Sequence, residues 1–189
     1  MAVLDMLNTK YIILASQQGG GPVAQQNPGA LGAAWYVKDF KMVANADSEI
    51  TALTGFLPRE TAIVDQRFND LLNGLKISYD SLATIRLVAY EPNHLTYQTN
   101  ASAEQLAVLS EIYYDKGWNA YLDGKPVPHF RANYVLRAMR VPAGAHKIEF
   151  KFEPEVYKTG ERIAMAGSVI LLLIFAGVMF REIRSAKTD

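Results

Sequence analysis

The side chains best suited to binding chemistry are concentrated in one segment, residues 113–133. Its sequence, YYDKGWNAYLDGKPVPHFRAN, mixes aromatic rings with amide, carboxylate and basic groups. If Trp118 points into a core, strand alternation places Tyr121 and Asp123 on the opposite, exposed face. An aromatic ring beside hydrogen-bonding groups suits a sugar. The segment therefore predicts a carbohydrate-binding site that comprises Trp118, Tyr121, Asp123, Arg131 and Asn133.

The same segment also has a purely structural interpretation. In it, Trp118 fills a core, Tyr121 covers the edge of a sheet, and the pair Asp123-Gly124 forms a tight turn. The sequence by itself leaves both interpretations open.

No arrangement of residues predicts an active site or a metal centre. The histidines, His94, His129 and His146, are scattered and lack the spacing of a helical metal motif. No serine stands in a nucleophile elbow, and the chain has no cysteine. Three successive glycines at residues 19–21 lack the Lys-Ser/Thr of a phosphate-binding loop. We therefore expect no catalytic residue, no metal and no cofactor, and a flexible loop over residues 16–29.

The charge of the chain is balanced. Its 189 residues include 19 lysines and arginines against 19 aspartates and glutamates. A protein without a net positive field has no long-range attraction for polyanions. Nucleic acid is therefore not an expected partner.

One stretch near the C-terminus differs from the rest, because residues 163–180 contain no charge. At about 1.5 Å per residue, a helix of this length spans roughly 27 Å, close to the ~30 Å hydrocarbon core of a bilayer. Only Ser168 interrupts the apolar surface, and its hydroxyl can bond back along the helix. We predict a transmembrane helix over residues 158–181, a tail over residues 182–189, and the lipid bilayer as a partner.

Basic residues on the two sides of this helix favour a cytoplasmic C-terminus. Lys158 and Arg162 precede the apolar stretch, whereas Arg181, Arg184 and Lys187 follow it. A domain exported in this way needs an export signal, which the first residues of the chain do not resemble. The chain is then either the end of a longer polytopic protein or a tail-anchored protein whose domain stays in the cytosol.

Residues 1–83 predict an α+β portion with short elements. We expect a short helix over residues 3–8, two further helices capped by Asp47 and Asp65, and short strands. These strands cover residues 10–14, 35–37, 40–43 and 61–64.

Residues 84–157 predict a β-sandwich-like portion. Strands are expected over residues 84–90, 94–99, 107–114, 118–122, 134–141 and 146–152. In the last strand Ile148 and Phe150 alternate with Lys147, Glu149 and Lys151, which predicts a core face and a solvated face. The expected fold class is α+β: a mainly antiparallel β-sandwich-like domain with short helices, followed by one C-terminal transmembrane helix.

Several stretches stand out in combination. They are YDKGWNAYLDGKPVP at residues 114–128, RANYVLRA at 131–138 and VPAGAHKIEFKFEP at 141–154, followed by the apolar helix. Together they resemble the C-terminal end of the YfhO family of bacterial membrane proteins. The earlier LNTKYII and NPGALGAAWYV fit the same family, in a form similar to that of Bacteroidetes members. The resemblance covers nearly the whole chain.

This resemblance carries expectations about function. Members of the family are large polytopic proteins that resemble GT-C-type glycosyltransferases, which use a polyprenyl-phosphate sugar donor to modify cell-envelope polymers. Their acidic catalytic residues lie in N-terminal extracytoplasmic loops that have no counterpart here, so the resemblance carries no catalytic residue onto this chain.

The resemblance implies an accessory or acceptor-binding region that is not catalytic by itself. It would lie on the extracytoplasmic side of a bacterial inner membrane, with a cytoplasmic C-terminus. The implied partners are the remaining membrane portion of the same protein and an envelope glycan or polyprenyl-linked sugar. The alternatives are a complete tail-anchored structural or interaction protein and a carbohydrate-binding β-sandwich module.

Overall fold

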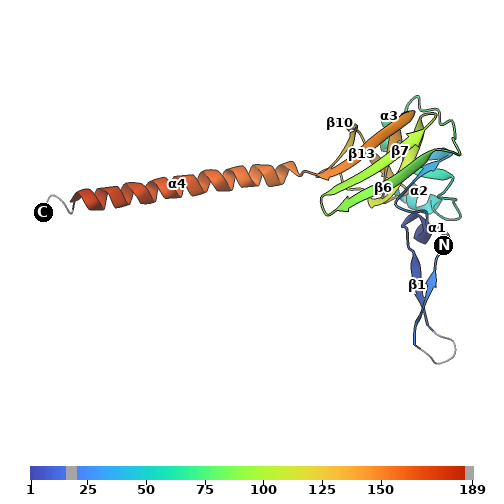
Figure 1. The fold of residues 1–189 in the computed structure, drawn as a ribbon, viewed down its shortest axis with the longest axis horizontal. Coiled ribbons are helices and arrows are strands. Elements are labelled where there is room, and N and C mark those ends of the chain that lie inside the picture. Colours follow the sequence, from blue (N-terminus) through green and yellow to red (C-terminus); the bar gives the residue numbers. More distant parts are fainter. Residues whose placement is uncertain (16–20, 186–189) are drawn as a thin grey trace. The chain divides into compact units, whose positions relative to one another are not determined.

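The computed structural model describes residues 1–15 and 21–185 and divides the chain into two compact units (Figure 1). The first unit, Met1–Phe152, contains all the strands that the structure describes, and the second begins at Glu153. Two predicted segments lie partly outside the described residues: the loop at residues 16–20, and the tail at residues 186–189. The predicted division between residues 83 and 84 stays a prediction.

Two antiparallel sheets form the body of the first unit. The five-stranded sheet has the order β10-β9-β13-β7-β6. Its strands are β6 (Thr84–Glu91), β7 (His94–Ala101), β9 (Trp118–Leu122), β10 (Lys125–Val127) and β13 (Gly144–Phe152). The four-stranded sheet has the order β11-β12-β8-β3 and contains β3 (Ala34–Val37), β8 (Gln105–Ile112), β11 (Phe130–Ala132) and β12 (Leu136–Val141). Figure 1 shows β6, β7 and β13 side by side in the larger sheet.

A hydrophobic core joins the two sheets. The larger sheet contributes Leu95, Tyr97, Ala120, Ile148 and Phe150, and the smaller sheet contributes Tyr36, Ala107, Leu109, Met139 and Val141. The two inner faces thus bury each other as in a β-sandwich. The predicted fold class, α+β with a mainly antiparallel domain, short helices and a C-terminal apolar helix, is confirmed.

A second core covers the other face of the four-stranded sheet. Trp35, Val37, Leu106, Val108 and Leu136 lie in it. The covering layer consists of the parallel pair β4 (Asp39–Val43) and β5 (Thr61–Asp65) with the helices α1 (Ala2–Met6), α2 (Ala46–Ala52), η1 (Gln66–Phe68) and α3 (Asn69–Leu72). Because the middle sheet is covered on both faces, β8 is buried without alternation from Gln105 to Leu109, and β12 from Leu136 to Met139.

A short antiparallel hairpin lies outside both cores. It pairs β1 (Tyr11–Leu14) with β2 (Val23–Gln26). The loop expected over residues 16–29 is therefore wrong for residues 23–26. Every residue of β2 is exposed, so the strand carries no burial pattern that a sequence could display.

Several predicted boundaries also change. Asn45, not Asp47, caps α2, since its Oδ1 accepts from Ser48 N at 3.0 Å. The predicted cap at Asp65 is confirmed, because its Oδ1 accepts from Arg67 N at 2.9 Å. The strand expected from residue 134 begins at Leu136, and the three-residue strands β10 and β11 were not expected.

The last strand of the sheet shows one difference from its predicted pattern. Ile148 and Phe150 are fully buried as predicted, but Glu149, expected in water, is only 7% exposed. The long side chains of Lys147 and Lys151 lie on either side of it along the strand and cover it.

The second unit consists of one long helix, α4 (Glu155–Ser185). The stretch Glu155–Arg181 of this helix is long and apolar enough to cross a membrane, and no other helix in the described residues is. Ser168 Oγ donates to Ala164 O at 2.9 Å, as predicted for a hydroxyl in an apolar helix. The helix begins before the predicted residue 158.

Candidate functional site

The segment singled out in the sequence forms a depression at the β9–β10 end of the larger sheet. Its volume is about 510 Å³. Aromatic and polar side chains share the lining, which includes Tyr113, Asp115, Trp118, Asn119, Tyr121 and His129. Rings next to carboxylate, amide and imidazole groups can bind a hydroxylated ring.

A tight turn at Asp123-Gly124 positions β9 against β10. Both residues have positive φ angles, 49° and 79°, as a two-residue hairpin turn requires. The Asp123 carboxylate ties this turn to β13, because Oδ1 accepts from Lys147 N at 2.8 Å and Oδ2 lies 2.7 Å from His146 Nδ1. The hydrogen bonds from Lys147 N and His146 lower the pKa of Asp123, and the Asp123 hydrogen bond raises the pKa of His146.

Trp118 and Tyr121 lie on opposite faces of β9, as predicted. Tyr121 stands opposite Glu149 in the register with β13, on the outer face of the sheet. Lys151 Nζ lies 5.0 Å from the centroid of the Tyr121 ring. The aromatic ring that β9 presents on this outer face is therefore that of Tyr121, which is half-buried.

Trp118 points inward and is a partly buried side chain that packs against the core. The guanidinium carbon of Arg137 lies 4.2 Å from its ring centroid, and the Phe152 ring lies at 5.4 Å. Arg137 thus occupies a ring face that a sugar would need for stacking. The structural interpretation of Trp118 agrees with this packing, although its binding role stays a prediction.

Arg137 is a buried cation, with only 2% of the residue exposed. Its Nε donates to Ile112 O at 2.9 Å, while Nη1 has no hydrogen-bond partner within the part of the chain that the structure describes. Burial lowers the pKa of this guanidinium, although Glu111 opposes the shift. The sequence does not predict this role of Arg137, since nothing in its spacing shows that it faces the core.

His129 forms a neutral wall of the depression. Burial lowers its pKa to about 4, and the charge of Arg137 adds to that shift. Its ring packs 5.4 Å from the centroids of both Tyr113 and Phe150. At pH 7 the imidazole therefore offers one donor and one acceptor rather than a charge.

Arg131 and Asn133 lie on the other side of the fold. Arg131 Nη2 is 2.6 Å from Glu49 Oε2 and 3.6 Å from Asp65 Oδ2. Asn133 is fully buried, and its Oδ1 accepts from Ile63 N at 2.8 Å. These contacts join the four-stranded sheet to β5 and α2. The structure therefore brings Trp118, Tyr121 and Asp123 together on one hairpin, but not Arg131 and Asn133, and the binding role of all five stays a prediction.

The described residues contain no group of three or more His, Asp or Glu side chains that could hold a metal ion. The described chain thus combines a β-rich domain with one helix that is long and apolar enough to cross a membrane. The sequence profile of the family described as "Bacterial membrane protein YfhO" matches residues 66–164, more than half of the chain. The chain therefore belongs to the YfhO family.

A curated relative has the same family name. It is the "Uncharacterized protein YfhO" of Bacillus subtilis (strain 168), which is 25% identical over 117 residues. The match covers 62% of this chain but only 13% of the relative. No solved structure matches the chain.

Proposed function

We propose that this chain is the extracytoplasmic C-terminal region of a polytopic YfhO-family protein. In this proposal it is the accessory or acceptor-binding part of a GT-C-like glycosyltransferase that modifies cell-envelope glycans, and it is not catalytic by itself. The chain would lie in the bacterial inner membrane, with the β-rich unit outside and the C-terminus in the cytoplasm.

The proposal is supported by the difference in length between this chain and its curated relative. The alignment uses most of this chain but about an eighth of the relative, which leaves room there for a separate catalytic part. The same protein's other membrane segments would then be the partner of α4. The aromatic depression supports an acceptor-binding role, since Tyr121 shares its lining with the polar groups of Asp115 and Asn119.

The absence of cysteine from this chain allows a direct test of topology. Lys125→Cys, in the exposed turn-proximal part of β10, and Lys187→Cys, in the tail, are introduced separately into the whole natural protein with any cysteines elsewhere replaced. Intact cells are treated with a membrane-impermeant maleimide. We expect Lys125→Cys to react at once and Lys187→Cys to react only after lysis.

Labelling after detergent lysis is the control, because both variants must react there. If Lys187→Cys reacts in intact cells while Lys125→Cys does not, the domain lies in the cytosol. That result would overturn the proposal and favour a tail-anchored structural or interaction protein.

A further inference from the structure

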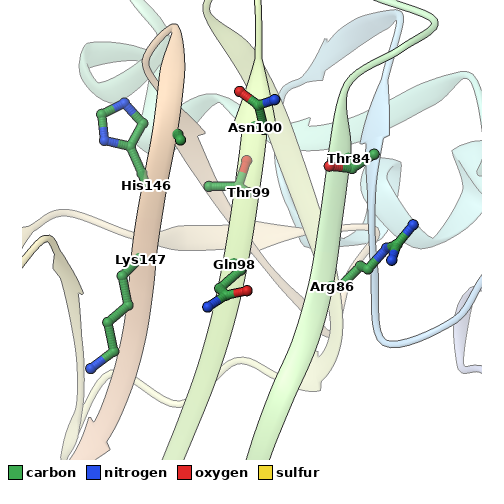
Figure 2. A pocket seen from close by; sticks show the side chains of 8 residues that line it. Thr84, Arg86, Gln98, Thr99, Asn100, His146 and Lys147 are labelled. Carbon is green, nitrogen blue, oxygen red and sulfur yellow. The ribbon is translucent and has the colours of Figure 1, made fainter.

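A second depression lies on the outer face of the larger sheet, across β6, β7 and β13 (Figure 2). Its volume is about 560 Å³. Register places Arg86 of β6 and Lys147 of β13 on either side of Gln98 of β7, so the three residues form one row across the sheet. Figure 2 shows Gln98 on the middle strand between the two basic side chains.

The lining of this depression is basic, although acids outside it pair with His146 and Lys147 and, within the described residues, leave Arg86 unpaired. Arg86, His146 and Lys147 contribute to it, and none of its eight residues is an aspartate or glutamate. His146 is paired with the Asp123 carboxylate at 2.7 Å, so the unpaired positive charge of the lining belongs to Arg86. The surface therefore attracts an anion.

Arg86 is the basic group with the most unused binding capacity. Its exposed side chain makes no ion pair or hydrogen bond within the described residues. By contrast, Arg131 and Arg140 pair with Glu49 and Glu104. A free guanidinium presents a planar set of donors that matches a carboxylate or a phosphate.

The positive charge of Lys147 is only partly neutralised. Its Nζ lies 3.2 Å from Glu149 Oε1, but Lys151 and His94 share that same oxygen. One carboxylate therefore faces three basic groups. The two lysines outnumber the one carboxylate, so the surface around Lys147 has a net positive charge that attracts an anion.

Neutral hydrogen-bonding groups separate the two cations. Thr84, Gln98 and Asn100 supply hydroxyl and amide groups to the same depression. Such groups match the hydroxyls of sugar rings better than they match a bare ion. The spacing of Arg86 and Lys147 across three strands fits an extended ligand, since adjacent strands lie about 4.8 Å apart.

We propose that this sheet face binds a glycan that carries carboxylate or phosphate groups. Arg86 and Lys147 hold the anionic groups, and Gln98 binds hydroxyls between them. The proposal goes beyond the function stated above and does not rest on the aromatic depression or on the topology of the chain.

The test uses the full chain in nanodiscs of phosphatidylcholine, a lipid without net charge. Calorimetry measures binding of three oligosaccharides of equal length: one with uronate rings, one phosphorylated and one neutral. We expect one or both anionic oligosaccharides to bind, with an affinity that falls as salt is added. Arg86→Gln should weaken that binding roughly tenfold.

Arg59→Gln is the matched control, because Arg59 is also exposed and the substitution changes the charge equally, but it does not line the depression. It should leave the affinity unchanged. Circular dichroism checks that both variants keep their strands. Equal binding of the neutral oligosaccharide that also depends on Arg86, equal loss in the two variants, or no binding of either anionic oligosaccharide would overturn the proposal.

A lipid headgroup is the competing anionic ligand. Vesicles that contain phosphatidylglycerol provide that arm of the experiment. Binding to these vesicles that depends on Arg86, together with failure of all three oligosaccharides, would also overturn the proposal and assign the face to the membrane surface.

Discussion

Glu149 Oε1 lies 2.9 Å from His94 Nε2 on the outer face of the larger sheet. The same oxygen is 3.2 Å from Lys147 Nζ and 3.5 Å from Lys151 Nζ. Burial by itself raises the pKa of Glu149, but the hydrogen bonds from Lys147 and His94 and the charge of Lys151 outweigh it, so the pKa lies below its ordinary value. The carboxylate therefore links three neighbouring basic side chains across two strands.

Replacing this carboxylate should destabilise the protein. We expect Glu149→Gln to lower the free energy of unfolding at pH 7 by about 2 kcal/mol, because charge-assisted hydrogen bonds are lost in a buried place. A carboxylate with a lowered pKa contributes stability above its unfolded pKa and loses it as pH falls through its folded pKa. The difference from the natural protein should therefore disappear in acid below pH about 4. Chemical denaturation of the full chain in detergent measures both values.

Glu60→Gln is the control for this prediction. Glu60 pairs with Lys38 at 2.7 Å, but both side chains are 46% exposed. Such surface pairs contribute about 0–1 kcal/mol. An equal loss of stability in the two variants would contradict the special role of Glu149.

The pair of Asp123 and His146 should titrate together. We expect His146 to show a pKa above its ordinary 6.5 in an NMR titration, and Asp123→Asn to move it back toward that value. Asparagine tolerates the left-handed turn conformation and keeps an acceptor for Lys147 N, so the variant should retain its fold.

The sign of the linked stability follows from the directions of the two shifts. The raised pKa of His146 contributes stability below its unfolded pKa that is lost as pH rises through the folded value. The lowered pKa of Asp123 contributes stability above its unfolded pKa that is lost in acid. The difference between Asp123→Asn and the natural protein should thus be largest between pH about 4 and 6.5. An unchanged His146 titration in the variant would contradict the pairing.

Arg137 should be replaceable by an apolar side chain of similar length. Arg137→Ala leaves a gap beside Trp118 and Phe150, and we expect it to cost about 3 kcal/mol of stability. Arg137→Met fills the gap and removes a buried charge, so its cost should be less than half of that. Denaturation followed by tryptophan fluorescence compares the two. Equal losses would show that the charge, not the packing, stabilises this part of the core.

Tyr121 should carry any sugar binding in the aromatic depression. We expect Tyr121→Ala to weaken binding of a neutral oligosaccharide to the full chain in nanodiscs about tenfold, since a ring that packs against the sugar is lost. Tyr121→Phe keeps the ring and should retain most of the affinity. Tyr11→Ala removes an exposed tyrosine of the β1–β2 hairpin that does not line the depression, and serves as the control. A glycan array without any bound sugar would refute the carbohydrate-binding prediction.

Much of the fold could be predicted because some signals are local. The alternation of Ile148 and Phe150 with charged residues revealed a strand, and the cap at Asp65 revealed a helical turn. The strand β2 left no such signal, because all its residues are exposed and it is extended only as the antiparallel partner of β1. The partner strand, not the side chains, decides whether such a segment is extended.

The candidate site was only partly predictable. Alternation correctly placed Trp118 and Tyr121 on opposite faces of β9. It could not show that Arg131 belongs to the four-stranded sheet and Asn133 to the turn after β11, where Glu49 and Ile63 hold them. Residues close in sequence separate in space when consecutive strands join different sheets.

The sequence by itself determined the family, the apolar helix and the α+β class, because each depends on residue types and local periodicity. Tertiary structure decided that the four-stranded sheet is covered on both faces, that Arg137 packs on Trp118, and that Arg86, Gln98 and Lys147 form one row. These features depend on which strands become neighbours and in what register. Pairing between distant segments is set by the burial of the whole chain, which no local pattern records.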